Sequence, residues 1–158
     1  MTNFHITKVL SALNGQGIEA RFVGGCVRDA LLKVPVQDVD LATPHRPETV
    51  IQLLEAAKIK VVGTGIKHGT VTAIIADNKY QITSLRIDTK TDGRHASVDF
   101  TDDWRKDAMR RDFTVNALSA CTKGIVYDYL NGLQDLSERR IKFVGPAESR
   151  IKEDHLRI

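Results

Sequence analysis

Two aspartates, Asp38 and Asp40, are separated by one apolar residue near the end of the stretch FVGGCVRDALLKVPVQDVDLAT at residues 22–43. If this segment is an extended strand, the two carboxylates point to the same face, about 6.6 Å apart along the strand. Val39 and Leu41 would then turn toward a core. Paired carboxylates suit divalent cations, because hard cations prefer oxygen ligands. The pattern therefore predicts a catalytic metal site at Asp38 and Asp40.

Two glycines, Gly24 and Gly25, follow an apolar run and open an amphipathic segment that contains Arg28. This order predicts a tight turn beside a helix N-terminus, where backbone N–H groups bind phosphate well. From the first turn of that helix, the Arg28 guanidinium can reach a phosphate. Metal-binding carboxylates close to a phosphate-binding turn indicate nucleotide chemistry.

Composition sets few limits on that chemistry. The chain has 158 residues, of which 42% are hydrophobic and 27% charged, as is ordinary for one globular domain. A net charge of +3 permits nucleic-acid binding without arguing for it. Cys26 and Cys121 lie in apolar surroundings and are expected to be buried free thiols. No secretory signal and no run of about 18 apolar residues occurs, so we expect a cytoplasmic protein with no membrane contact.

The elements that must position the candidate residues alternate along the chain. Residue spacing predicts helices over residues 3–14, 26–32, 47–57, 102–109, 115–120 and 133–138, and from 146 onward. Strands are predicted over residues 18–23, 36–42, 59–62, 70–76, 80–85, 125–129 and 141–144. Residues 87–98 are polar and have no apolar period, which predicts a mobile loop. The expected fold class is α+β.

Taken together, the motifs resemble the catalytic head of the class II tRNA nucleotidyltransferases and bacterial poly(A) polymerases, relatives of the DNA polymerase beta superfamily. The first family motif corresponds to GGCVRD at 24–29 with DVDLAT at 38–43, and the second to RRDFTVNA at 110–117. Three further segments resemble family segments in the same order: KHGTV at 67–71, TDGRHASVDFTDDW at 91–104 and RIKFVG at 140–145.

The resemblance implies a DNA polymerase beta-like head, with a mixed, mainly antiparallel β-sheet flanked by helices. This head would span residues 1–145, and residues 146–158 would be the start of a truncated helical neck. The implied reaction is metal-dependent transfer of CMP or AMP from CTP or ATP to the 3′-hydroxyl of an RNA. The favoured substrate is the 3′ end of tRNA. Asp38 and Asp40 would hold two Mg²⁺ ions, and pyrophosphate would leave.

The resemblance also implies the residues that bind the nucleotide. Gly24, Gly25 and Arg28 would approach the triphosphate, Arg111 would neutralise a phosphate, and Asp112 would accept a hydrogen bond from the sugar 2′-hydroxyl. Asn116 would either join this group or satisfy neighbouring backbone groups. Asp154 and Arg157 would either border the nucleotide or form a solvated pair on one helical face. Lys67 and His68 would either face the nucleotide or shape a turn, and the turn is the favoured interpretation.

One residue departs from the family pattern. Family members usually carry a third carboxylate in a sequence close to YEVTTxR, whereas this chain has YQITSLR at 80–86. Gln81 offers a neutral carbonyl oxygen and is therefore a poorer metal ligand than a glutamate. We expect weakened catalysis. The alternatives are a poly(A) polymerase, an enzyme that adds only A or only C, and a non-catalytic nucleotide- or RNA-binding module.

Overall fold

The computed structural model describes residues 4–15, 17–76, 78–92 and 95–153. The helices are α1 Phe4–Leu13, α2 Gly25–Leu31, α3 Pro47–Ala56, α4 Trp104–Met109, α5 Gly132–Ser137 and α6 Ala147–Glu153, with short 3-10 turns η1 Ile66–His68 and η2 Thr114–Asn116. The strands are β1 Arg21–Val23, β2 Asp40–Thr43, β3 Lys60–Gly65, β4 Thr70–Ile75, β5 Asn78–Ser84, β6 Arg86–Asp92, β7 His95–Phe100, β8 Ser119–Ala120 and β9 Val126–Tyr127.

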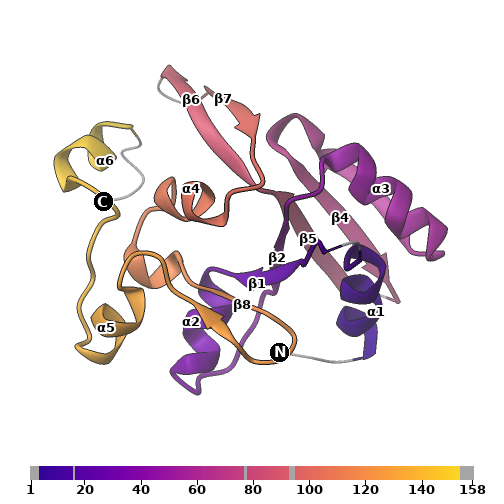
Figure 1. The fold of residues 1–158 in the computed structure, drawn as a ribbon, viewed down its shortest axis with the longest axis horizontal. Helices are drawn as coiled ribbons and strands as arrows, with labels where there is room; N and C mark the ends of the chain where they lie inside the picture. Colours follow the sequence, from indigo (N-terminus) through magenta and orange to yellow (C-terminus); the bar gives the residue numbers. More distant parts are fainter. Residues whose placement is uncertain (1–3, 16, 77, 93–94, 154–158) are drawn as a thin grey trace.

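A seven-stranded sheet in the order β3-β4-β5-β2-β1-β8-β9 forms the centre of the molecule (Figure 1). Strands β2 and β5 pair in parallel, whereas the other neighbouring strands described in this sheet pair antiparallel. The expected α+β fold with a mixed, mainly antiparallel sheet is confirmed.

Helices α1 and α3 lie together beside the β3–β5 part of the sheet (Figure 1). Leu10 from α1 and Leu54 from α3 are buried in the same cluster as Leu41 and Ile82 from the central strands. Pro47 begins α3, where its missing N–H costs nothing because the first helical N–H groups have no intrahelical partner. The apolar face of the sheet is therefore covered, and functional side chains must lie on the other face.

The strand of the predicted metal site is shorter than expected. It begins at Asp40, so Asp38 precedes the strand instead of sharing it. The reason is that the neighbouring strand β1 ends soon after Phe22, which pairs with Leu41. Just beyond Val23 the chain turns into α2, so β1 offers no residue opposite Asp38.

Residues 86–92 and 95–100 form the two strands of a β-ribbon, so the predicted loop at 87–98 is wrong for the residues described there. Strands β6 and β7 pair antiparallel as a separate two-stranded sheet that projects from the main sheet (Figure 1). The prediction searched for an apolar period, but backbone hydrogen bonds between two strands need none. Gly93, a residue type typical of hairpin turns, was the available signal in the sequence.

The C-terminal part differs from the prediction in three places. Asp103, not Asp102, caps α4, accepting hydrogen bonds from the backbone N–H groups of Arg105 and Lys106 at 2.8 and 3.3 Å. The apolar segment 115–120 is not a helix, because η2 ends at Asn116 and β8 follows. The predicted strand at 141–144 is reduced to an isolated bridge between Phe113 and Phe143.

Helix α5 packs against η2 and holds it in place. Gly132 opens α5, and a Cβ atom at this position would lie 2.2 Å from the carbonyl oxygen of Thr114. Only a glycine permits this approach, and the Thr114 hydroxyl also donates a 2.7 Å hydrogen bond to Asp135. The two contacts hold the turn that carries Asn116.

Candidate functional site

Asp40 and Gln81 are direct neighbours across the parallel pair of strands. The register pairs Asp40 of β2 with Gln81 of β5, and Gln81 in turn with Thr72 of β4. Side chains at paired positions point to the same face of a sheet. The structure therefore brings the two predicted metal residues of the strands together and places Gln81 where a third ligand from β5 would lie.

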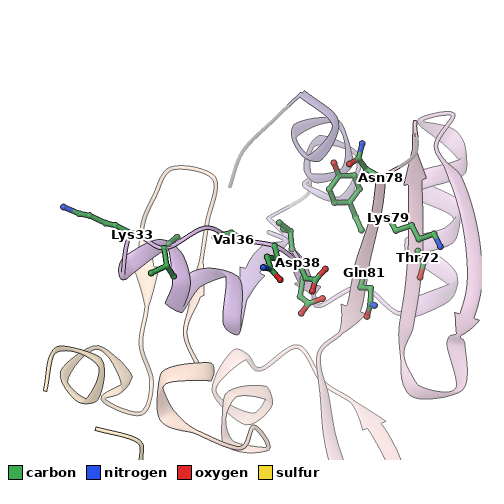
Figure 2. A pocket seen from close by; sticks show the side chains of 13 residues that line it. Lys33, Val36, Asp38, Thr72, Asn78, Lys79 and Gln81 are labelled. Atoms are coloured by element: carbon green, nitrogen blue, oxygen red, sulfur yellow. The ribbon is translucent and has the colours of Figure 1, made fainter. Parts of the chain in front are cut away.

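These side chains line a cavity of about 830 Å³ on the open face of the sheet. Figure 2 shows Asp38 near the strand that carries Gln81, while Lys33 extends away from the carboxylates. The cavity is lined by Ala30, Lys33, Val34, Val36, Gln37, Asp38, Val39, Asp40, Thr72, Asn78, Lys79, Tyr80 and Gln81. Its walls come from the end of α2, the segment before β2, and the hairpin of β4 and β5.

The two carboxylates are available to a cation. Both side chains are exposed, and in the described part of the chain no hydrogen bond or ion pair engages the carboxylate oxygens of Asp38 or Asp40. Burial against surrounding protein atoms raises the pKa of Asp40, the Arg111 guanidinium lowers it, and the charge of Asp38 raises it again. Uncommitted, mutually repelling carboxylates form the donor set that Mg²⁺ prefers, so these residues fit the ion.

Gly24 lies close to the side chain of Arg111 and to the backbone of residues 116–118. It has φ +74°, and a Cβ atom there would lie 3.3 Å from Nη1 of Arg111. The Gly24 N–H donates to the carbonyl of Leu118 at 3.1 Å. This N–H is therefore used inside the protein, and the first glycine of the predicted phosphate turn serves close approach and backbone conformation.

The predicted nucleotide-binding residues converge on one network beside α2. Nη1 of Arg28 donates to Oδ1 of Asn116 at 2.7 Å, and Nδ2 of Asn116 donates to Oδ1 of Asp112 at 3.3 Å. The sequence left open whether Asn116 serves neighbouring backbone groups. In the structure its side chain connects Arg28 to Asp112, two residues that are far apart along the chain.

Arg111, two residues beyond the end of α4, approaches the same network. Its Nη1 lies 3.5 Å from the carbonyl oxygen of Asn116, and its Nη2 donates to Oδ2 of Asp107 at 3.1 Å. Sequence reasoning missed Asp107, which is 2% exposed. The spacing of Asp107 from Arg110 and Arg111, three and four residues, is that of ion pairs on a helix and was the available signal.

Four other residues named from the sequence have simpler outcomes. Asp154 and Arg157 lie outside the described residues, so their predicted place beside the nucleotide stays a prediction. Lys67 and His68 lie exposed in η1, and Gly69 ends the turn with φ +81°. They shape a turn, as predicted.

Comparison with known proteins gives the family. Residues 20–142 match the poly A polymerase head domain. The chain belongs to this family. The match contains both motifs that carried the resemblance, and it includes Gly24, Asp40 and Arg111.

Individual relatives carry more specific names. Human mitochondrial CCA tRNA nucleotidyltransferase 1 is 48% identical over 141 residues, which are 89% of this chain and 32% of that protein. The crystal structure of the Bacillus stearothermophilus CCA-adding enzyme in complex with CTP superposes with a TM-score of 0.85 and 36% identity, over 99% of this chain and 38% of that one. A tRNA nucleotidyltransferase complexed with a primer tRNA and an incoming ATP analog gives a TM-score of 0.70 and 27% identity, over 94% of this chain and 42% of that one.

The chain thus spans about a third of the length of its human relative, 32%. Two expectations from composition can be compared with the structure. Cys26 and Cys121 are buried and free, as predicted. Across the described ranges, no helix is long and apolar enough to cross a membrane.

The raised pKa of Asp40 predicts that Asp40→Asn stabilises the protein at neutral pH. The carboxylate is ionised there in both states, and its ionised form is disfavoured in the folded state. The gain should be at most about 0.5 kcal/mol, because the side chain is exposed and screened by water. It should vanish below the pKa of an unfolded aspartate, about 3.9, where the group is protonated in both states.

Urea unfolding of both proteins at neutral pH and near pH 3 measures this difference. Asp99→Asn, at an exposed position in β7, is the control for the general effect of removing one negative charge. A variant that is no more stable than the parent at neutral pH, or that keeps its gain in acid, would contradict the assigned environment of Asp40.

Proposed function

We propose that this chain is the catalytic head of an RNA 3′-end nucleotidyltransferase. It would transfer CMP and AMP from CTP and ATP to the 3′-hydroxyl of tRNA, building the CCA end and releasing pyrophosphate. The observation that carries the proposal is the position of Asp40. It is paired with Gln81 in the sheet, and its pKa is lowered by Arg111, which lies beside the Arg28–Asn116–Asp112 network. Relatives named as CCA-adding enzymes favour this reaction over the addition of A alone, C alone or poly(A).

Asp38 and Asp40 would hold two Mg²⁺ ions, with Gln81 as a weaker neutral ligand. Bound there, the ions would activate the RNA 3′-hydroxyl and stabilise the departing pyrophosphate. Within the described ranges, no group of three or more His, Cys, Asp or Glu side chains could hold a metal. The carboxylates therefore supply two ligands, and affinity for the ions should be lower than with a third carboxylate.

The network beside α2 would hold the incoming nucleotide. Arg28 and Arg111 are the cations that face this side of the carboxylates, and two arginines suit a triphosphate because each guanidinium can donate several hydrogen bonds. Both hydrogen bonds described for the carboxylate of Asp112, from Asn116 and from the N–H of Phe113 at 2.7 Å, end on Oδ1. Oδ2 would accept the hydrogen bond from the ribose 2′-hydroxyl, which disfavours deoxynucleotides.

The cavity would receive the acceptor RNA. In-line attack requires the 3′-hydroxyl to lie opposite the leaving pyrophosphate. In the sheet, β5 and β4 lie on one side of β2, while β1 and β8, which flank the nucleotide network, lie on the other. Lys79, which lines the cavity, offers donors to an RNA backbone.

The domain division stays part of this proposal. Residues 1–145 would form the head, and α6 with the residues after it would begin the neck, where Asp154 and Arg157 would border the nucleotide. A cytoplasmic location rests only on the free cysteines and is proposed on that basis. A non-catalytic nucleotide-binding module is the second candidate, and Gln81 is the observation that favours it.

Incorporation of labelled CTP and ATP into a tRNA that lacks its CCA end tests the function. The natural full-length protein should incorporate both nucleotides in Mg²⁺, and Asp38→Ala or Asp40→Ala should abolish incorporation while nucleotide binding persists. Incorporation of ATP alone would identify an A-adding enzyme or a poly(A) polymerase. Nucleotide binding without any incorporation would replace the enzyme with a binding module.

Gln81→Glu should strengthen the metal site. A third carboxylate beside Asp40 adds a charged oxygen ligand, so the Mg²⁺ concentration for half-maximal incorporation should fall about tenfold. Gln81→Ala, which removes the amide oxygen, is the matched control and should raise that concentration. An unchanged Mg²⁺ requirement in both variants would show that position 81 does not face the ions.

Lys79→Ala should selectively weaken binding of the acceptor RNA. Lys79 lies two residues before Gln81 in β5 and lines the cavity. The KM for tRNA should rise several-fold, with the KM for CTP unchanged, and the slope of log affinity against log salt should fall by about one. Lys8→Ala, an exposed position in α1, is the charge-matched control. A larger change in the KM for CTP than for tRNA would place the nucleotide in the cavity instead.

A further inference from the structure

Asp107 is a buried carboxylate that gathers three donors from two parts of the chain. It is 2% exposed. Oδ1 accepts from Nε of Arg110 at 2.8 Å and from the backbone N–H of Arg86 at 3.2 Å, and Oδ2 accepts from Nη2 of Arg111 at 3.1 Å. A carboxylate taken out of water is costly unless its oxygens are paired, and here both are.

The partner of Oδ2 is Arg111, the arginine whose charge acts on Asp40. Nη1 of Arg111 approaches the carbonyl oxygen of Asn116 and lies under Gly24, whose missing Cβ leaves the space. The same guanidinium lowers the pKa of Asp40. Arg111 therefore stands between two carboxylates of different character, one buried and hydrogen-bonded to it, the other exposed and uncommitted.

The position of Arg111 between these groups has a chemical consequence. Without a buried partner, the guanidinium would be drawn to Asp38 and Asp40, since opposite charges attract strongly in partly buried surroundings. It would then occupy the oxygens that a cation needs and leave the nucleotide side of the site. The hydrogen bond to Asp107 opposes this movement.

We propose that Asp107 is a positioning residue for nucleotide binding. Its carboxylate holds Arg111 by Nη2, directs Nη1 toward the triphosphate, and keeps the guanidinium off Asp38 and Asp40. The proposal rests on the proposed function, because it requires a nucleotide beside Arg111. It assigns Asp107 a role through Arg111, without contact between Asp107 and the substrate.

Equilibrium binding of CTP and ATP to the full-length protein tests this role, measured by calorimetry in EDTA so that no metal contributes. Asp107→Asn keeps the shape and removes the charge, and should weaken binding about tenfold to a hundredfold. Glu19→Gln is the matched control. Glu19 is another carboxylate paired with an arginine, Nε of Arg21 at 3.0 Å, and it belongs to no part of the nucleotide network. The control should leave nucleotide affinity unchanged.

A double-mutant cycle separates positioning from general structural damage. In an Arg111→Ala background, Asp107→Asn should cause no further loss of affinity, because Asp107 acts through the missing side chain. Additive losses, or equal affinity of Asp107→Asn and the parent, would overturn the proposal. If Asp107→Asn does not fold, Asp107→Glu keeps the charge but displaces it, and unchanged affinity in that variant would overturn it as well. A parent protein that binds no nucleotide would refute the proposed function itself.

Discussion

The parallel pairing of β2 with β5 is the constraint on which the site depends. It places Asp40 opposite Gln81 on the open face and, one residue later, Leu41 opposite Ile82 in the core. Because side chains alternate along a strand, a shift by one residue would bury Asp40 and expose Leu41. The fully buried Leu41 and Ile82 therefore fix the register that brings the functional side chains together.

The sequence predicted the residues of the site better than the elements that hold them. Chemically distinctive residues at fixed spacing, such as Gly24, Arg28 and Asp40, predicted which side chains would lie near one another without any knowledge of tertiary contacts. The strand at 36–42 was predicted from alternation alone, which says nothing of where a neighbouring strand ends. Whether Asp38 lies inside β2 depends on the end of β1, and this is a property of the fold.

Other misses have the same origin. Asn116 was predicted within an apolar helix, because local composition does not show that α5 packs against residues 114–116 and holds them as a 3-10 turn. Asp107 resembled an ordinary charged helix residue, and its burial follows only from packing of α4 beside the start of β6. The ribbon of β6 and β7 could have been predicted from Gly93, since turn chemistry is local.

A glutamine at position 81 affects the ionisation of Asp40 as well as the number of carboxylate ligands. The neighbouring charge of Asp38 already raises the pKa of Asp40, and Arg111 lowers it. A third carboxylate at position 81 would raise that pKa further, because each added negative charge disfavours ionisation of its neighbour. With a neutral amide there, Asp40 stays ionised to lower pH and remains able to bind a cation. In the proposed enzyme Gln81 would therefore weaken the metal site by one ligand while making one of the remaining ligands easier to ionise, and the two effects would oppose each other.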